Sequence, residues 1–276
     1  MDICQQLQLN IYMRLDKYLI EHNFFSSREK AQTAIKHNTV KVNGTIVTKA
    51  SLDIHDDMTV EVIDIFNKFV SMGGLKLEKA IEDFELDFQG KQVLDIGSST
   101  GGFTDCALQN GAAHVTAIDV GTNQLVEKLR NDDRVLSLEN KDFRDLLPSD
   151  VDNRRYDFIV SDVSFISLTY ILPYCAQFLK PDGKMMLLIK PQFEAGASFI
   201  SRSGIVTDEK GYKVAIQKVV NEALNQHFYL NGLSISTLFE LHKNVEFLSL
   251  FSFQDNRFRL DLNKICEDVK LVKKSL

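Results

Sequence analysis

The sequence predicts an α/β protein in which a mostly parallel sheet carries helices on both faces, preceded by a small α+β domain. Three observations predict this class. From about residue 93 onward, short apolar runs alternate with helical spacers. Before them come two helical patterns and an Asn43-Gly44 turn of the kind that joins antiparallel strands. The last two apolar runs are separated only by a short polar turn, so the final strand is expected to be antiparallel.

The small domain is predicted over residues 13–62. Apolar side chains recur at helical spacing in its two helices: Leu15, Tyr18, Leu19, Ala31, Ala34 and Ile35. Ser26 or Ser27 is the expected N-cap of the second helix, and Asn38 its expected end. The run from Val40 to Val42 then predicts a strand, and Ile46-Val47 the return strand of a hairpin.

The main domain is predicted over residues 76–276, after a linker at 63–75 in which Gly73-Gly74 breaks the chain. Its parallel strands are expected at 93–96, 115–120, 135–138, 158–161 and 185–189. The adjacent antiparallel strands are expected at 233–241 and 247–253. Residues 1–12 are predicted to be a disordered extension or the result of a mis-assigned start.

The composition argues against several classes of protein. No run approaches the roughly 18 apolar residues of a membrane helix, and the first residues lack the features of a secretory signal. The four cysteines are scattered without a CxxC pair, so neither a disulfide framework nor a metal site is expected. These features predict a cytoplasmic protein.

The charge distribution favours a nucleic-acid partner for the small domain. The whole chain carries a net charge of −6, which opposes phosphate binding. Between residues 13 and 51, however, seven basic residues outnumber three acidic ones. Such a face can dock on phosphates and so position a protein on RNA. An ordinary solvated basic surface is the alternative.

The strongest candidate for a ligand site is the segment 95–104, where a strand runs through small residues into a helix. Small residues let a ligand approach the backbone at the carboxyl edge of the sheet. The segment matches neither GxGxxG nor a phosphate loop. Asp95 suits the amine of an amino-acid moiety, and Asp119 at the end of the next strand suits ribose hydroxyls. A tight turn without a ligand is the alternative.

Further charged residues are expected at the same edge of the sheet. Asp162 and Lys190 follow two other strands and could together hold a hydroxyl group and take its proton. Glu246 begins a strand, and an antiparallel direction would bring that beginning to the same edge. Lys76 opens the first helix of the main domain. Taken singly, each could equally be a solvent-facing residue.

Several stretches resemble known families. MRLDKYL, SSREKAQTAI and VKVNG resemble the RNA-binding domain shared with ribosomal protein S4. SMGGLKLEKA, VLDIGSSTGGFTDCALQNGA, AIDVGTNQL, SDVSFISL and LIKPQFEAG resemble the TlyA branch of the FtsJ-like ribose methyltransferases. The resemblance covers nearly the whole chain. It implies a Rossmann-like domain that uses S-adenosylmethionine, and ribosomal RNA or ribosomal subunits as partners.

The resemblance also implies roles for individual residues. The family's Lys-Asp-Lys-Glu tetrad for 2′-O-methylation falls on Lys76, Asp162, Lys190 and Glu246, with Lys190 as the candidate base. The residues expected to hold S-adenosylmethionine are Asp95, Gly97, Ser98, Ser99, Thr100, Gly101, Gly102, Phe103, Asp119, Val120, Asp142 and Phe143. The residues expected to contact RNA are Arg14, Lys17, Ser27, Arg28, Lys30, Lys36, Lys41 and Asn43.

The chain departs from the family pattern at a few positions. Met72 and Thr207 stand where the family has arginine, which removes two basic groups that could contact RNA. Tyr212 replaces a histidine, Asp142 an asparagine and Lys243 a glycine.

The main prediction is 2′-O-methylation of a ribose, that of a cytidine, in ribosomal RNA. A non-catalytic RNA-binding or ribosome-associated factor is the alternative, which the missing basic groups favour and the intact tetrad opposes. A pore-forming hemolysin, an older label in this family, would need membrane-seeking segments. The stretch from Leu260 to Leu276 is more simply a surface helix.

Overall fold

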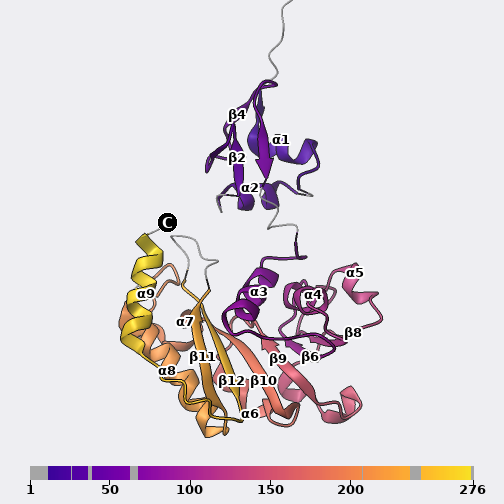
Figure 1. The fold of residues 1–276 in the computed structure, drawn as a ribbon, viewed down its shortest axis with the longest axis vertical. Coiled ribbons are helices and arrows are strands. Elements are labelled where there is room, and N and C mark those ends of the chain that lie inside the picture. The colour runs from indigo at the N-terminus through magenta and orange to yellow at the C-terminus, as the bar shows by residue number, and fades with distance from the viewer. Residues whose placement is uncertain are drawn as a thin grey trace, which may run out of the picture. The chain divides into compact units, whose positions relative to one another are not determined.

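The computed structural model describes residues 12–25, 27–36, 39–62, 68–206, 208–236 and 244–274. The chain divides into two compact units between Lys68 and Phe69 (Figure 1). Among the described residues, the first unit has one apolar core, and the second unit has two.

The first unit packs two helices against short antiparallel strands. Its elements are β1 (Met13–Arg14), α1 (Leu15–Glu21), α2 (Arg28–Lys36), β2 (Val40–Val42), β3 (Thr45–Ile46), β4 (Asp53–Ile54) and β5 (Val60–Val62). β2 pairs with β3 and β5, while β1 pairs with β4. Leu15, Leu19 and Ala34 are fully buried, so apolar positions predicted from helical spacing form this core.

The turn between β2 and β3 has the predicted geometry. Asn43 and Gly44 both adopt positive φ, 50° and 75°, as a tight hairpin turn of this kind requires. The side-chain oxygen of Asn43 also accepts a hydrogen bond from the backbone of Thr59 at 2.9 Å. The return strand includes Ile46 but not the predicted Val47, and the predicted helix end at Asn38 lies outside the described residues.

The second unit is built on a seven-stranded sheet in the order β11-β12-β10-β9-β6-β7-β8. The strands are β6 (Gln92–Ile96), β7 (His114–Ile118), β8 (Val135–Leu138), β9 (Tyr156–Ser161), β10 (Leu179–Ile189), β11 (Tyr229–Ile235) and β12 (Phe247–Ser252). Strands β10, β9, β6, β7 and β8 are parallel, whereas β12 runs against both of its neighbours. The prediction of a mostly parallel sheet with an antiparallel last strand is therefore confirmed.

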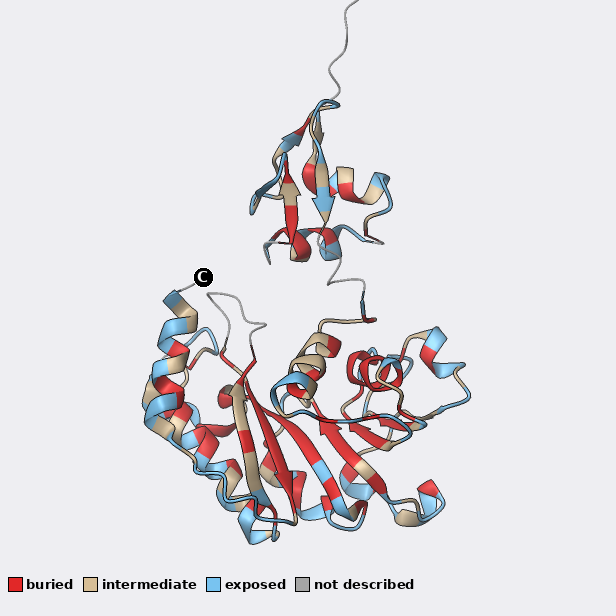
Figure 2. Cartoon of the chain, viewed as in Figure 1, coloured by how far each residue is buried: buried red, intermediate tan, exposed pale blue. Residues whose placement is uncertain are grey.

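Helices cover both faces of this sheet (Figure 1). One apolar core includes buried residues of α3 (Gly73–Asp83), α4 (Gly102–Gln109) and α5 (Glu127–Arg130). The other includes α6 (Leu172–Cys175), α8 (Glu209–Asn225) and α9 (Leu262–Lys274). Val93 packs in the first core and its neighbour Leu94 in the second, because successive strand side chains point to opposite faces. Figure 2 shows that most residues of the central strands are buried.

The strand register brings distant segments to one edge of the sheet. Ser161 of β9 lies beside Ile96 of β6 and Leu187 of β10, so these three strands end at the same edge of the sheet. Ile189 at the end of β10 lies opposite Phe247 at the start of β12. The residue that precedes β12 therefore reaches the same edge as the residues that follow the parallel strands.

The beginning of α3 differs from the prediction. Gly73 and Gly74 are its first two residues, so they start a helix instead of breaking the chain, and they do so within the segment predicted as a linker. The reason is local packing. A Cβ on Gly74 would lie 2.4 Å from Cγ of Phe69, so this helical turn approaches the phenyl ring more closely than any side chain would allow.

Strand β11 also differs from the prediction, because it begins at Tyr229 and not at Leu233. A shift in register between Leu230 and Gly232 interrupts the alternation of apolar residues that would identify this part of the strand. A Cβ on Gly232 would lie 2.8 Å from the ring of Phe84, which explains the glycine. Residues 237–243, which include the predicted end of this strand, lie outside the described residues.

Helix α9 confirms the prediction of a surface helix near the C-terminus. It buries Ile265, Cys266 and Val269 against the second unit and exposes its charged side. In the described parts of the chain, no helix combines the length and the apolar character that a bilayer span requires.

Candidate active site

Four charged side chains meet at the carboxyl edge of the sheet. Lys76 lies in the first turns of α3, Asp162 follows β9, Lys190 follows β10, and Glu246 precedes β12. Because β12 is antiparallel to β10, its beginning reaches the edge where the parallel strands end. The fold thus brings together the four residues that the sequence resemblance singled out.

The four side chains form a continuous series of ion pairs. Nζ of Lys76 lies 2.7 Å from Oε2 of Glu246 and 3.1 Å from Oδ2 of Asp162. Nζ of Lys190 lies 2.8 Å from Oδ1 of Asp162. Asp162 therefore bridges the two lysines with its two carboxylate oxygens, and two positive charges face two negative ones.

The surroundings of Lys76 keep its ammonium group charged. Burial lowers the pKa of Lys76, but the nearby carboxylates of Asp162 and Glu246 outweigh burial and raise the pKa above its ordinary value. An opposite charge within about 4–6 Å favours the charged form of a titratable group. Lys76 is therefore a fixed cation at neutral pH and is not available as a base.

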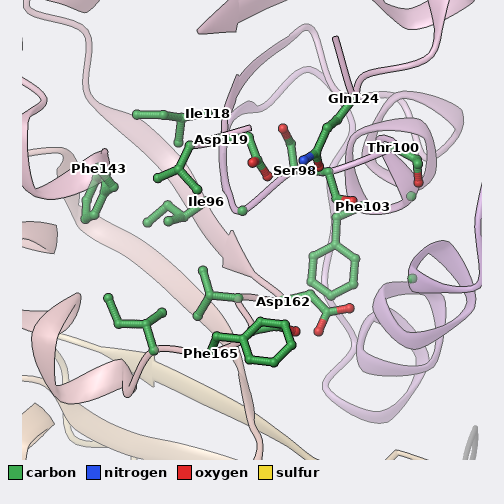
Figure 3. Close-up of a pocket in the computed structure, with 18 of the residues that line it drawn as sticks. Ile96, Ser98, Thr100, Phe103, Ile118, Asp119, Gln124, Phe143, Asp162 and Phe165 are labelled. Atoms are coloured by element: carbon green, nitrogen blue, oxygen red, sulfur yellow. Dashed lines mark hydrogen bonds between the residues drawn. The ribbon is translucent and has the colours of Figure 1, made fainter. Parts of the chain in front are cut away.

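Asp162 and Lys190, two of the four charged residues, line a pocket of about 470 Å³ (Figure 3). Ile96, Ile118 and Phe143 line one part of it, while Phe103, Asp162 and Phe165 gather at another (Figure 3). Its volume is in the range of small-molecule sites, roughly 300–1,000 Å³. An apolar part next to a charged part suits a ligand with a flat ring system at one end and a reacting group at the other.

Two glycines shape the turn that forms one wall of the pocket. Gly97 and Gly101 have φ values of 80° and 99°, which L side chains rarely adopt. A Cβ on Gly97 would lie 2.8 Å from Cγ1 of Val163, and one on Gly101 would lie 2.3 Å from Cδ1 of Leu129. Both positions therefore require glycine.

Asp119 ties this turn to the end of β7. Its Oδ2 accepts a hydrogen bond from the backbone N–H of Ser99 at 2.8 Å, and its Oδ1 accepts one from Gly121 at 2.7 Å. A carboxylate oxygen can accept more than one hydrogen bond. Asp119 can therefore hold the turn and still accept hydroxyl groups of a ligand in the pocket.

Asp95 lies beneath the turn and is only 1% exposed. Oδ2 accepts a hydrogen bond from the hydroxyl of Thr104 at 2.6 Å, and Oδ1 has no partner among the residues that the structure describes. Burial raises the pKa of Asp95 to about 7, partly opposed by the Thr104 hydrogen bond. A buried carboxylate oxygen without a partner, one residue before the pocket wall, suits a nearby cationic ligand.

Most residues predicted to hold the cofactor line the pocket: Gly97, Ser98, Ser99, Thr100, Gly102, Phe103, Asp119, Val120, Asp142 and Phe143. Asp95 and Gly101 do not line it. They support the turn from behind, because one is buried below it and the other packs against Leu129. The carboxylate of Asp142 is already engaged by the guanidinium of Arg144, with the closest atoms 2.6 Å apart.

The pocket also contains residues that the sequence analysis did not assign to a ligand site: Ser71, Gly73, Gln124, Lys141, Ser164 and Phe165. Phe165 is the most unusual, since it is 91% exposed and has a φ of 65°. Its ring lies 5.3 Å from that of Phe193. Positive φ at a bulky residue indicates local strain, which often accompanies function. The stretch SDVSFISL carries this residue, but no sequence pattern reveals its exposure or its backbone strain.

Two of the basic residues predicted to contact RNA converge on a buried carboxylate in the first unit. Nη2 of Arg14 lies 3.0 Å from Oδ2 of Asp16, and Nη2 of Arg28 lies 2.9 Å from the same atom. The hydrogen bond from Arg14 is the main cause that holds the pKa of Asp16 well below its usual range. The two guanidinium groups stay partly exposed and are held close to one another.

Among the other residues predicted to contact RNA, two have a structural role and the lysines differ in exposure. Ser27 caps α2 by accepting a hydrogen bond from the backbone of Lys30 at 3.3 Å, and Asn43 belongs to the hairpin turn. Ser26 lies outside the described residues. The side chains of Lys17, Lys30 and Lys36 are exposed, and that of Lys41 is half-buried.

One departure from the family pattern has a structural explanation. Tyr212 is buried, and its hydroxyl donates a hydrogen bond to the carbonyl of Val206 at 2.8 Å. The replacement of a histidine at this position therefore changes the core and not the surface. Thr207 and Lys243 lie outside the described residues.

Comparison with known families assigns both units. Residues 69–253 match the model of the FtsJ-like methyltransferases, which is more than half of the chain, and residues 13–60 match the S4 domain. The chain belongs to the FtsJ-like methyltransferase family. The family prediction and the predicted pairing with an S4 domain are thus confirmed.

Several known proteins are similar to this family member over most of its length. A Bacillus subtilis protein, YqxC, provisionally assigned as an rRNA methyltransferase, is 43% identical over 85% of this chain and 84% of its own. The 16S/23S rRNA (cytidine-2′-O)-methyltransferase TlyA of Mycobacterium tuberculosis is 35% identical over 88% of this chain and 91% of its own. A solved structure from Streptococcus thermophilus, provisionally called a hemolysin, superposes with a TM-score of 0.75 at 38% identity and covers 96% of this chain and 98% of its own.

Proposed function

We propose that this chain transfers the methyl group of S-adenosylmethionine to the ribose 2′-hydroxyl of a cytidine in ribosomal RNA. The observation that carries the proposal is the ion-paired set of Lys76, Asp162, Lys190 and Glu246, of which Asp162 and Lys190 line a pocket with apolar walls. Support for the substrate comes from TlyA of Mycobacterium tuberculosis, a relative 35% identical over most of both chains, whose name specifies rRNA and the cytidine 2′-oxygen.

The residues around the pocket fit S-adenosylmethionine. Ile96, Ile118 and Phe143 would enclose the flat adenine, and Asp119 would accept the ribose hydroxyls. The unpartnered oxygen of Asp95 would favour the positively charged amino-acid end nearby. When bound there, S-adenosylmethionine would supply an electrophilic methyl group.

The four charged residues would activate the ribose hydroxyl. Lys190 in its neutral form would take the hydroxyl proton, while the ribose oxygen forms a bond to the methyl carbon and the bond from that carbon to sulfur breaks. The proton would then pass from Nζ of Lys190 to solvent. Asp162 would hold both lysines, and Glu246 would anchor Lys76 as a permanent cation. General-base assistance contributes about 10²–10⁴-fold, and positioning of the reacting groups contributes further.

Phe165 would receive the base of the target nucleotide. Its ring is 91% exposed at the pocket and lies close to Asp162 (Figure 3). RNA-binding proteins commonly recognise unpaired bases by stacking them on aromatic side chains. A base held on Phe165 would leave its own ribose near Lys190.

The first unit would dock on the phosphates of ribosomal RNA or of a ribosomal subunit. The basic residues proposed to contact phosphates are Arg14, Lys17, Arg28, Lys30, Lys36 and Lys41. Two polar residues are proposed to join them, Ser27 at the start of α2 and Asn43 in the turn between β2 and β3. Phosphate contacts position a protein on RNA, whereas the shape of the RNA and its unpaired bases supply specificity. Such a substrate places the enzyme in the cytoplasm with the ribosomes.

Replacement of the candidate base tests this proposal. Lys190→Ala should lower the rate of methyl transfer to ribosomal RNA at least 100-fold, because no other group takes the proton. Binding of S-adenosylmethionine, measured by calorimetry, should remain within a few-fold of normal. Lys184→Ala, which removes an exposed lysine of β10, the strand that Lys190 follows, is the matched control and should keep normal activity. A Lys190→Ala enzyme that retained a tenth of the activity would overturn the assignment of the base.

Membrane lysis is the second function to assay, because a solved relative is provisionally called a hemolysin. Release of a dye from liposomes by the purified chain, at concentrations where no methyl transfer occurs, would favour a lytic protein. Methyl transfer without dye release would favour the enzyme.

A further inference from the structure

Ser164 lies beside the candidate base in the pocket. Its Oγ accepts a hydrogen bond from Nζ of Lys190 at 2.6 Å, the shortest of the contacts that Lys190 makes. Nζ also lies 2.8 Å from Oδ1 and 3.3 Å from the backbone oxygen of Asp162. Three protein oxygens thus surround the ammonium group of Lys190, a residue that is only 7% exposed.

The hydroxyl of Ser164 differs from the other two acceptors because it carries a hydrogen atom of its own. Within the part of the chain that the structure describes, it makes no hydrogen bond except the one with Lys190. A serine hydroxyl can accept two hydrogen bonds and donate one. Ser164 therefore has its own hydrogen atom available for a ligand while it holds Lys190.

The loop that carries Ser164 is fixed at two points by one short segment of chain. Lys190 comes directly before the helix α7 (Pro191–Glu194), and Glu194 ends it. Oε2 of Glu194 accepts a hydrogen bond from the hydroxyl of Ser167 at 2.5 Å, and its Oε1 accepts one from the backbone of Leu168 at 2.7 Å. Glu194 is only 3% exposed. The contact between Ser164 and Lys190 is therefore held by the fold and is not a chance meeting of two mobile side chains.

We propose that Ser164 is a positioning residue that sets both the direction and the proton affinity of Lys190. This inference rests on the proposed function, in which Lys190 must lose a proton before it can act. A hydrogen bond from the ammonium group to a hydroxyl oxygen stabilises the charged form of lysine relative to the neutral form. Ser164 thus opposes deprotonation in the resting enzyme and aims the nitrogen at the ribose oxygen.

Other charged groups also face Lys190 and set the background against which Ser164 acts. Asp162, which follows β9, faces it directly and forms an ion pair with it. Lys76 on α3 and Glu246 before β12 reach it through Asp162. Asp95 on β6 lies close enough to Asp162 for that negative charge to raise the pKa of Asp95. Replacement of Ser164 leaves these four titratable groups in place, so its effect on proton affinity can be separated from theirs.

The dependence of kcat on pH in the full chain tests the inference. In Ser164→Ala the acidic limb of the profile should move to lower pH by about one unit, because a lost hydrogen bond to a charged group has about this effect. The plateau rate should fall, since the nitrogen is no longer aimed. Ser164→Thr keeps a hydroxyl, so the acidic limb of its profile should lie at the same pH as in the unsubstituted chain. Ser203→Ala removes a serine from an exposed turn and is the control.

A second measurement follows Lys190 itself. In protein labelled with ¹³C at lysine Cε, the resonance that disappears in Lys190→Arg should titrate at lower pH in Ser164→Ala than in the unsubstituted chain. An unchanged limb together with an unchanged titration would overturn the role of Ser164 and leave the proposed function standing. An unsubstituted chain that transferred no methyl group to ribosomal RNA would overturn both.

Discussion

At the scale of single residues, the site contains four charged side chains that form ion pairs and one buried carboxyl group that, within the described parts of the chain, forms none. Lys76, Asp162, Lys190 and Glu246 neutralise one another in one cluster. Asp95 is buried nearby, with one oxygen bonded to Thr104 and no partner for the other among the described residues. An unpaired carboxylate in such surroundings holds a proton more tightly than it does in the unfolded chain.

The buried carboxyl group of Asp95 should make stability depend on pH. Its pKa in the folded chain is about 7, above the ordinary 3.8, so the protonated form stabilises the fold at low pH. This contribution is lost as the pH rises through about 7. Relative to Asp95→Asn, the free energy of unfolding should therefore fall by about 2–3 kcal/mol between pH 5 and pH 8.

Urea denaturation of both proteins at several pH values measures this difference. Asp133→Asn removes an exposed carboxylate and is the control, and its curve should run parallel to that of the unsubstituted chain. If the curve of Asp95→Asn also ran parallel to that of the unsubstituted chain, the buried carboxyl group would be ionised over the whole range of pH, which would contradict the prediction.

Much of the site at this scale could be predicted from the sequence. Asp162 and Lys190 could be predicted because each follows a recognisable apolar strand, and Glu246 because it precedes one. Ser164 and Phe165 could not be, since their importance comes from one hydrogen bond and one exposed ring in a loop. The support of the turn from behind by Asp95 and Gly101 also depends on packing that only the fold shows.

At the scale of elements, the packing of α3 against α4 positions Lys76. A Cβ on Gly102, the first residue of α4, would lie 2.9 Å from the backbone nitrogen of Gly74. A Cβ on Gly74 would in turn lie 2.4 Å from the ring of Phe69. The two helices therefore start in close contact, and a displacement of α3 would carry Lys76 away from Asp162.

Replacement of the helical glycine tests this coupling. Gly74→Ala should destabilise the protein by about 1–3 kcal/mol, as overpacking in a core usually does, and should lower the melting temperature by several degrees. Methyl transfer should fall about tenfold or more, because Lys76 moves with the helix. Thermal unfolding and a methyl-transfer assay measure the two effects. Glu82→Ala, on the exposed side of α3, should change neither. A Gly74→Ala enzyme with normal stability and activity would contradict the coupling.

The strands were easier to predict than their arrangement. Val135–Leu138 is a strand with the predicted limits, because a short apolar run between polar residues is a local signal. The order of the seven strands and the position of β12 between β10 and β11 depend on contacts between distant residues. In β11, an irregular register around Gly232 hid the first part of the strand.

At the scale of the whole molecule, an acidic chain is proposed to bind RNA through a basic stretch of its first unit. The net charge is −6, whereas residues 13–51 carry four more basic than acidic groups, seven against three. Binding that depends on such a local face should weaken steeply with salt, because phosphate contacts release bound cations.

One exposed lysine of the first unit tests this account of RNA binding. Lys17→Ala in the full chain should reduce the slope of log affinity against log salt by about one, as expected for the loss of one phosphate contact. Filter binding to ribosomal RNA at several salt concentrations measures the slope. Lys264→Ala, an exposed lysine on α9, should leave the slope unchanged. Equal slopes for all three proteins would place the RNA contact elsewhere.

The division of the chain was predictable in outline. A hairpin turn followed by alternating strands and helices distinguished the two units, and the chain divides between Lys68 and Phe69. The limits of the linker, predicted at 63–75, depend on how Phe69 and Gly74 pack, which no local pattern reveals.

The most direct test of the central claim is to identify the product. Ribosomal subunits are incubated with the purified chain and S-adenosylmethionine that carries a deuterated methyl group, and the RNA is then digested to nucleosides for mass spectrometry. The account predicts labelled 2′-O-methylcytidine, which is absent when Lys190→Ala replaces the active chain. Label on a base, or no label in either subunit, would contradict it.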